Sequence, residues 1–224
     1  MNDLILAVDT THEFGSLALL RGGMVREETL LYSPEGFGQI LFGRIAEMLA
    51  RHAVEAGEIE CFAAASGPGS FTGVRIGLAA IKGLAEANGK PAVGVSNLAA
   101  MAAFGSAARR AVVIDARRGE VYGAVYDASG AVVTPETVMP FPAWLDRLPE
   151  GEIEFIAMDF SPFAPAVAGT RWAQAPVTTA PRALAGAVGR IAWERWRAGQ
   201  AADPAAIDAN YVRRSDAELF WKEY

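Results

Sequence analysis

The chain has 224 residues, a formal net charge of −6, and a hydrophobic fraction of 52% that is ample for a core. The acidic balance argues against a protein that grips nucleic acid alone, because phosphate binding needs a basic field. A single cysteine, Cys61, excludes an internal disulfide framework and fits a reducing compartment, so we expect a cytoplasmic protein with Cys61 in its core. We expect neither a signal peptide nor a membrane span, because the N-terminus has no basic region and no apolar run approaches about 18 residues.

The first half of the chain alternates strand patterns with helix patterns. Three strands come first, with a hairpin turn at Gly22-Gly23, and the pattern predicts them at residues 4–10, 16–21 and 24–31. Apolar residues at helical spacing then predict a helix from Phe37 to near Gly57, crossing over to a parallel strand. That strand and the elements after it are expected at 61–65 (strand), 71–88 (helix), 92–95 (strand) and 97–108 (helix, capped by Ser96).

The second half restarts the same plan. Val112-Val113-Ile114-Asp115 mirrors Leu6-Ala7-Val8-Asp9, and the elements after the two aspartates keep step to within about one residue. The remaining elements are expected at 119–126 (strand), 127–130 (turn), 131–133 (start of a strand), 141–148 (helix), 155–158 (strand) and 183–199 (helix), with a largely irregular tail from residue 203. We therefore predict a domain-scale duplication, with an N-terminal half at 1–108 and a reduced C-terminal half at 109–224.

The most distinctive stretch runs from Ser66 to Gly77. A strand, a glycine turn and a helix form the layout of an anion site, because backbone N–H groups at a helix start attract negative charge. The spacing of Gly67, Gly69 and Gly73 is one residue longer than the dinucleotide pattern, however, and no P-loop Gly-Lys-Ser/Thr follows. The alternative is a tight turn whose glycines permit close packing.

The helix after this turn lacks an ordinary polar face. Val74, Leu78, Ile81 and Ala85 form one apolar face, and the other side carries small or apolar residues: Gly73, Ile76, Gly77, Ala80, Gly83 and Leu84. Such a helix is buried on more than one side. Because each glycine costs about 1 kcal/mol against alanine, we expect close approach of another helix, from this chain or a partner.

The sequence Ser66-Gly-Pro-Gly-Ser-Phe-Thr-Gly-Val-Arg-Ile-Gly77 resembles the signature of the TsaB family, also called YeaZ. The resemblance extends to Ile5–Thr10, Val93–Ser96, Ile114–Tyr122 and Tyr211–Arg214. It implies an α/β protein with the duplicated actin/Hsp70/sugar-kinase-like (ASKHA) fold, built as two βββαβα-type halves of which the second is reduced. It also implies a bacterial subunit of the machinery that makes threonylcarbamoyladenosine beside the tRNA anticodon.

The resemblance further implies a non-catalytic subunit that binds and activates a TsaD-like catalytic subunit, together with a TsaE-like ATPase. Such a subunit would meet tRNA only through the complex, have no membrane contact and form a homodimer when alone. It would carry no cofactor of its own, which leaves ATP or ADP to the partner complex. The expected partner interface consists of two neighbouring helix starts: Phe37, Ile40, Leu41, Arg44, Ser70, Phe71, Thr72, Gly73, Arg75, Ile76, Gly77 and Ala80.

Asp9 and Asp115 occupy the places where kinases of this superfamily handle phosphate-bound metal. The segment after Asp9 has only one glycine, and Ala116-Arg117-Arg118 has none, so we interpret both aspartates as strand-end acceptors of backbone hydrogen bonds. TsaD holds a metal with two histidines four residues apart, whereas this chain has only His12 and His52. It also departs from TsaB by having Gly36-Phe37-Gly38-Gln39 in place of the usual His-Ser pair. We therefore assign no catalytic, cofactor-binding or metal-binding residue.

Two alternatives stay open at this point. One is a small-substrate kinase or ATPase, and the other is a glycoprotease-like hydrolase of the same fold, although neither Ser70 nor Ser96 has an evident base. The cluster of Arg117, Arg118 and Glu120 could face a partner or a nucleotide, or form a solvated hairpin.

Overall fold

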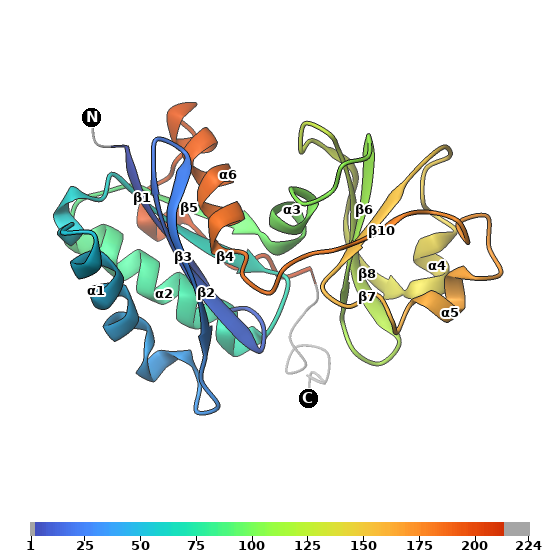
Figure 1. Cartoon of the computed structure of the whole chain (residues 1–224), viewed down its shortest axis with the longest axis horizontal. Coiled ribbons are helices and arrows are strands. Elements are labelled where there is room, and N and C mark those ends of the chain that lie inside the picture. Colours follow the sequence, from blue (N-terminus) through green and yellow to red (C-terminus); the bar gives the residue numbers. More distant parts are fainter. Residues whose placement is uncertain (1–2, 213–224) are drawn as a thin grey trace, which may run out of the picture. The chain divides into compact units, whose positions relative to one another are not determined.

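The computed structural model describes residues 3–212, and these form two compact units (Figure 1). The first unit combines the chain up to Ala100 with Pro181–Ala209, and the second contains Met101–Ala180 and continues from Asn210. This division differs from the predicted boundary between residues 108 and 109. The reason is that a late helix, α6 (Ala185–Arg197), packs on the first unit's sheet.

The first unit is built on a five-stranded sheet with the order β3-β2-β1-β4-β5. These strands are β1 (Leu4–Asp9), β2 (Phe14–Arg21), β3 (Met24–Tyr32), β4 (Cys61–Gly67) and β5 (Ala92–Ser96). Strand β1 lies centrally, antiparallel to β2 and parallel to β4, and all six of its residues are buried, as its apolar sequence predicts. Cys61 is a core residue in β4, where burial raises the pKa of its thiol to about 12.

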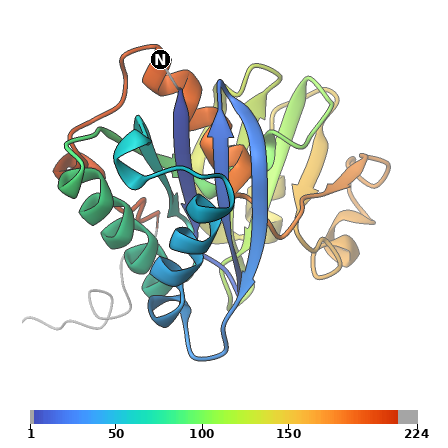
Figure 2. The same ribbon diagram turned by 60° about the vertical axis from the view of Figure 1, so that its left-hand side comes forward.

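Helices cover both faces of this sheet (Figures 1 and 2). On one face, α1 (Leu41–Arg51) and α2 (Phe71–Ala87) share a core with Leu17 and Leu19 of β2. Helix α6 packs on the opposite face of the sheet, with Gly189 against Leu20 of β2. Short 3-10 turns η1 (Phe37–Gln39), η2 (Ala56–Glu58) and η3 (Pro204–Ala206) complete the unit.

The second unit repeats this arrangement with the order β10-β9-β6-β7-β8. Its elements are β6 (Arg109–Asp115), β7 (Glu120–Asp127), β8 (Val132–Pro140), α4 (Phe141–Leu145), β9 (Glu154–Ala157), α5 (Ala164–Val167) and β10 (Val177–Thr179), after the linking helix α3 (Asn97–Ala102). Strand β6 pairs antiparallel with β7 and parallel with β9, as β1 does with β2 and β4. The predicted ASKHA-type duplication is confirmed, and β10 and α5 are elements that the sequence did not reveal.

Two helices end earlier than their patterns predict. Helix α1 ends at Arg51 because Ala53 adopts a left-handed backbone with φ +50°, a conformation that glycine usually signals. Helix α3 ends at Ala102, although Ser96 caps it as expected by accepting the N–H of Leu98 at 3.1 Å. Within residues 3–212 no helix is long and apolar enough to cross a membrane.

The irregular tail agrees with the expectation as far as the described residues reach. It includes the turn η3, and a bridge between Ala202 and Ala92 of β5 lies just before it. Arg213 and Arg214, which belong to the resemblance noted above, lie outside the described residues.

Candidate functional site

The loop after β1 lies directly against the start of α2. The Thr11 carbonyl oxygen accepts the Ser70 N–H at 2.7 Å, and the Thr10 hydroxyl donates to the Gly73 carbonyl at 2.7 Å. Ser70 caps α2 by accepting the Gly73 N–H at 3.3 Å. The N–H groups of Ser70 and Gly73 are therefore already engaged within the chain, which argues against a phosphate site at this helix start.

Gly69, Gly73 and Gly77 allow the close contact between the start of α2 and the loop after β1. A Cβ atom at Gly73 would overlap the Thr10 carbonyl oxygen, and one at Gly77 would lie 2.6 Å from the Thr10 hydroxyl. A Cβ at Gly69 would lie 2.5 Å from the Thr11 carbonyl oxygen. These glycines bring α2 against the loop of its own unit, so the expectation that they admit another helix is wrong at Gly73 and Gly77. The tight-turn interpretation of Gly69 and Gly73 fits this geometry.

A buried polar network holds the loop after β1. Asp9 Oδ1 accepts hydrogen bonds from the N–H of Thr11 at 2.9 Å and from its hydroxyl at 2.6 Å. The Asn97 amide donates to that hydroxyl at 2.6 Å and accepts the Gly67 N–H at 2.9 Å. Asp9 Oδ2 and His12 Nε2 are buried without a hydrogen-bond partner among the described residues. Burial lowers the pKa of His12, and the nearby Asp9 carboxylate opposes this effect.

The residues predicted for the partner interface divide by exposure. Five are exposed, namely Arg44, Ser70, Phe71, Thr72 and Arg75, and two are half-buried, namely Ile40 and Ile76. The other five are buried within the unit: Phe37, Leu41, Gly73, Gly77 and Ala80. The buried five lie beneath the exposed residues and pack within the unit, so the exposed and half-buried seven are the ones that this conformation presents to solvent.

The sequence prediction missed other exposed residues on the same two helices. Phe42 is 56% exposed and Phe71 is 43% exposed, so each presents a large apolar ring to solvent. Small exposed residues accompany them at Gly38, Gly43, Ala46, Ala79 and Gly83. We call the exposed and half-buried residues of this region the α1/α2 surface: Gly38, Ile40, Phe42, Gly43, Arg44, Ala46, Ser70, Phe71, Thr72, Arg75, Ile76, Ala79 and Gly83. Helices α1 and α2 lie on the same side of the sheet (Figure 2).

Gly43 and Gly83 are the informative glycines of this surface. Each lies inside a helix, and a Cβ atom added at either position would meet nothing within 4 Å. Glycine in a helix interior costs about 1 kcal/mol against alanine, and no contact in the unit compensates for that cost. Close approach of another molecule's backbone would explain glycine at both positions. The sequence analysis identified Gly83 but not Gly43.

The α1/α2 surface contains two charged residues, Arg44 and Arg75, and both make contacts within the chain. Arg44 forms an exposed ion pair with Glu47 at 2.9 Å, and the Arg75 guanidinium lies over the Phe71 ring, 3.7 Å from its centre. A guanidinium stacked in this way covers part of an apolar surface while it keeps its charge. The surface thus combines exposed aromatic rings, small residues and two arginines.

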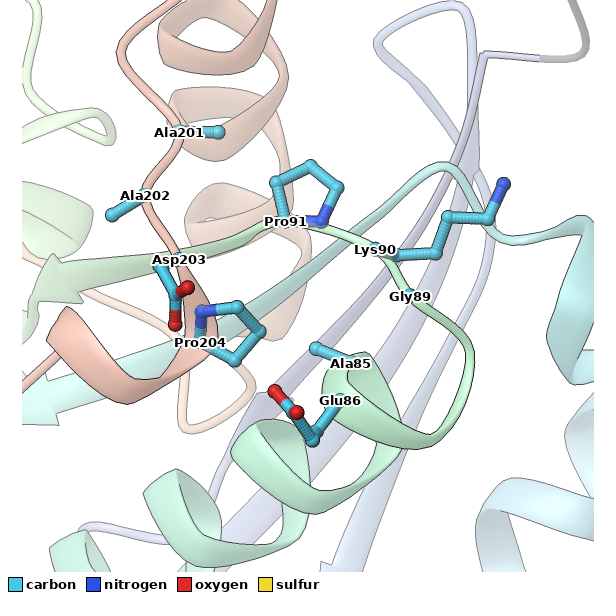
Figure 3. Close-up of a pocket in the computed structure, with 9 residues that line it drawn as sticks. All are labelled: Ala85, Glu86, Gly89, Lys90, Pro91, Ala201, Ala202, Asp203 and Pro204. Atoms are coloured by element: carbon cyan, nitrogen blue, oxygen red, sulfur yellow. The ribbon is translucent and has the colours of Figure 1, made fainter.

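A cavity of about 360 Å³ lies beside the C-terminal end of α2 (Figure 3). Its wall brings together two carboxylates, because the side chains of Glu86 and Asp203 both face it, whereas the Lys90 side chain points away from Asp203. Asp203 also caps η3 by accepting the Ala205 N–H at 2.8 Å. Two carboxylates disfavour a phosphate, so this cavity does not suit a nucleotide.

The two histidines lie in different settings. His52 Nε2 is 2.8 Å from Glu27 Oε2, and Glu27 also accepts hydrogen bonds from Arg51. His12 is half-buried in the loop after β1, and its Nε2 atom is buried. Over residues 3–212, no three His, Cys, Asp or Glu side chains gather in a way that could hold a metal ion.

The family model and the curated relatives that match this chain are both named for tRNA threonylcarbamoyl chemistry. Residues 35–176, more than half of the chain, match the family model described as TsaD, tRNA N6-adenosine threonylcarbamoyltransferase. The TsaB protein of Escherichia coli is 38% identical over 60% of this chain, and the match covers 64% of that relative, just under two thirds of its length. The TsaB protein of Bacillus subtilis is 31% identical over 70% of this chain and 72% of its own.

A solved structure extends this likeness to almost the whole chain. YeaZ from Pseudomonas aeruginosa superimposes with a TM-score of 0.79 at 26% identity, covering 93% of this chain and 99% of that one. The sequence matches and this shared fold lead to the same conclusion: the chain belongs to the TsaB (YeaZ) family.

Proposed function

We propose that this chain is a non-catalytic subunit in the biosynthesis of tRNA threonylcarbamoyladenosine, and that it docks a TsaD-like catalytic subunit through the α1/α2 surface. The relatives' names connect the family to this modification. The observation that carries the docking proposal is the exposed α1/α2 surface, with Phe42 and Phe71 beside two glycines that have no packing role. Exposed apolar patches of this kind mark partner sites.

Activation follows from docking through linkage. A subunit that binds one conformation of its partner better than another shifts the population towards that conformation, about tenfold for each 1.4 kcal/mol of differential binding. The chain needs no catalytic group for this role. When the catalytic partner is absent, the same surface would pair with a second copy in a two-fold arrangement.

The remaining partners follow from this role. ATP or ADP and a TsaE-like ATPase would act at the assembled complex, since the loop after β1 closes on α2 without a glycine-rich phosphate hairpin. We expect tRNA to bind the isolated chain weakly, because a net charge of −6 repels phosphate. Tight, salt-dependent tRNA binding by this chain alone would contradict that expectation.

The alternatives of a small-substrate kinase, ATPase or glycoprotease-like hydrolase gain no specific support from the geometry. Ser70 Oγ accepts a backbone N–H at the helix cap, and Ser96 Oγ does the same at α3, so both serines have structural roles. A simple check is ATP turnover by the purified chain, for which the subunit proposal expects no activity above background.

The docking proposal is tested by Phe42→Asp, which replaces an exposed apolar ring of the α1/α2 surface with a charge. Met24→Asp is the matched control, because Met24 is 59% exposed but lies in β3, outside the α1/α2 surface. We expect Phe42→Asp to weaken binding to the TsaD-like subunit by more than tenfold in calorimetry and to reduce modified tRNA in parallel. Equal affinity for both variants and the unaltered chain would contradict the proposed docking surface.

A further inference from the structure

A cavity of about 240 Å³ lies in the first unit, where the segment after α6 crosses the edge of β5. Its lining comes from β4, β5, α6 and that segment, and all of it belongs to the first unit. Four of the lining residues are polar, namely Ser66, Arg195, Gln200 and Asp208. No residue of the α1/α2 surface lines this cavity, so it is separate from the proposed docking surface.

The Ser66 hydroxyl is the most informative polar group of this cavity. Ser66 is only 6% exposed, and its hydroxyl makes no hydrogen bond with any residue in the described range 3–212. A buried hydroxyl without a partner costs free energy, and native structures pair such groups with protein, water or ligand. Because Ser66 lines the cavity, a molecule held there can supply the missing partner.

Arg195 lines the same cavity from α6 and is half-buried. Its Nη1 donates a hydrogen bond to the Gly94 carbonyl at 2.9 Å, which fixes the side chain beside β5. A guanidinium has five N–H donors, so donors remain for a second acceptor. A planar guanidinium that is already held in place suits the two oxygens of a carboxylate.

Asp208 brings the opposite charge to the cavity. Its Oδ1 accepts the Ala209 N–H at 2.7 Å, and its other oxygen has no hydrogen-bond partner among the described residues. Arg195 and Asp208 form no ion pair with each other in that part of the chain, although both line this one cavity. The cavity therefore offers both a cation and an anion to the molecule that it holds.

The charges and the size of the cavity together select a class of ligand. A simple anion would be repelled by Asp208 and a simple cation by Arg195, whereas a zwitterion is complementary to both. Pockets for drug-sized ligands measure roughly 300–1,000 Å³, so a cavity of about 240 Å³ suits a more compact molecule. We propose that this cavity binds a small free α-amino acid, with its carboxylate at Arg195, its ammonium group at Asp208 and a hydrogen bond to Ser66 Oγ.

Gly94→Ala is the variant that blocks the cavity. A Cβ atom at Gly94 would lie 3.5 Å from the Ser66 Cβ and 3.9 Å from the Ser66 Oγ, which is ordinary contact without a clash. The added methyl group thus occupies space beside the Ser66 hydroxyl while the unit still folds. We expect this variant to keep the unfolding temperature of the unaltered chain and to lose amino-acid binding.

Asp208→Asn tests the charge. Asparagine keeps the Oδ1 acceptor for the Ala209 N–H but removes the partner of the ammonium group. Asp203→Asn is the matched control, because Asp203 is also exposed and also accepts a backbone N–H, that of Ala205 at 2.8 Å. Asp203 faces the other cavity, beside the end of α2 (Figure 3).

The measurement is calorimetry of the purified full chain with glycine, L-alanine and L-serine. We expect at least one of them to bind with a Kd of about 1 mM or below. The amide and the N-acetyl derivative of the amino acid that binds most tightly each lack one charge, and both should bind at least about tenfold more weakly. Gly94→Ala and Asp208→Asn should each weaken binding by at least about tenfold, whereas Asp203→Asn should keep the affinity of the unaltered chain.

Several results would overturn the proposal. If none of the three amino acids binds at about 10 mM, the cavity holds ordered water instead, and water is the partner of Ser66. Equal binding of either derivative would refute the zwitterionic ligand. Binding that Gly94→Ala leaves unchanged, or that Asp203→Asn weakens as much as Asp208→Asn does, would refute this site. The TsaD-like subunit takes no part in these measurements, so the docking proposal is tested separately.

Discussion

Asp9 and Asp115 make the same local hydrogen bond in the two units. Asp9 Oδ1 accepts the N–H of Thr11 at 2.9 Å, and Asp115 Oδ1 accepts the N–H of Arg117 at 2.8 Å. Their surroundings differ, because Asp9 and Thr11 are fully buried whereas Asp115 and Arg117 are exposed. The duplication thus preserved the strand-end turn, while the first unit buried it under α2 and the second left it open.

This difference predicts unequal effects on stability. Asp9→Ala leaves a buried N–H and hydroxyl of Thr11 without their acceptor, so we expect the free energy of unfolding to fall by about 1–3 kcal/mol. Asp115→Ala frees an exposed N–H that water can satisfy, so its loss should stay below about 1 kcal/mol. Urea unfolding of both variants measures the two effects, and a larger loss for Asp115→Ala would contradict the assigned burial.

Asp9→Asn separates structure from chemistry, because asparagine keeps the Oδ1 acceptor. We expect tRNA modification by the reconstituted complex to change modestly, since the chain is proposed to supply no catalytic group. The measurement follows complex formation and modified tRNA together. Loss of modification with normal assembly would show that this chain contributes chemistry.

A substitution at Gly73 should destabilise the fold, whereas Gly73 itself is buried and is not expected to contact the partner. An added methyl group overlaps the Thr10 carbonyl, and backbone cannot move aside as a flexible side chain can. We expect Gly73→Ala to lower the free energy of unfolding by about 3 kcal/mol or more. Circular dichroism during denaturation checks this, and a variant as stable as the unaltered chain would contradict the contact.

Neighbouring carboxyls in β3 predict opposite dependences of stability on pH. A hydrogen bond from Arg51 is the main cause that lowers the pKa of Glu27 from 4.5 to about 2, with burial opposing it. A lowered pKa contributes stability above about pH 4.5 that is lost as the pH falls towards 2. Burial raises the pKa of Glu28, partly offset by the Gly186 N–H and Arg190, so its contribution is present at low pH and lost as the pH rises through that raised pKa.

Glu27→Gln and Glu28→Gln therefore form a matched pair. Glu27→Gln should make the loss of stability on acidification less steep, and Glu28→Gln should make it steeper. Urea midpoints measured from about pH 3 to about pH 7 test both signs. Changes in the same direction for both variants would contradict the assigned environments.

The sequence predicted the strands of both units and their duplication because apolar runs and turn residues mark them locally. It missed β10, because a strand of three half-buried or exposed residues has no apolar pattern, and it missed the left-handed Ala53 that ends α1. The exchange of α6 into the first unit depends on tertiary contacts, such as the Ser16 hydroxyl that accepts the Ala185 N–H at 2.9 Å.

The location of the partner interface stays a prediction, and the structure adds details of this surface that the sequence does not contain. Helical periodicity identifies α2 as apolar nearly all round, yet it cannot tell a glycine that faces its own loop, such as Gly77, from one that faces solvent, such as Gly83. Phe42 was overlooked because a single aromatic residue beside a strong apolar face carries no signal of exposure. The cavity that Ser66 shares with Asp208 joins residues far apart in the sequence, which local patterns cannot relate.

The most direct test of the docking account is Gly43→Ala with Gly83→Ala. Alanine fits both helices without a clash, so the account predicts an increase of about 1–2 kcal/mol in the free energy of unfolding. It also predicts at least tenfold weaker binding to the TsaD-like subunit, because the added methyl groups keep the partner's backbone away. A more stable chain that binds the partner with unchanged affinity would contradict the claim that these glycines are kept for docking.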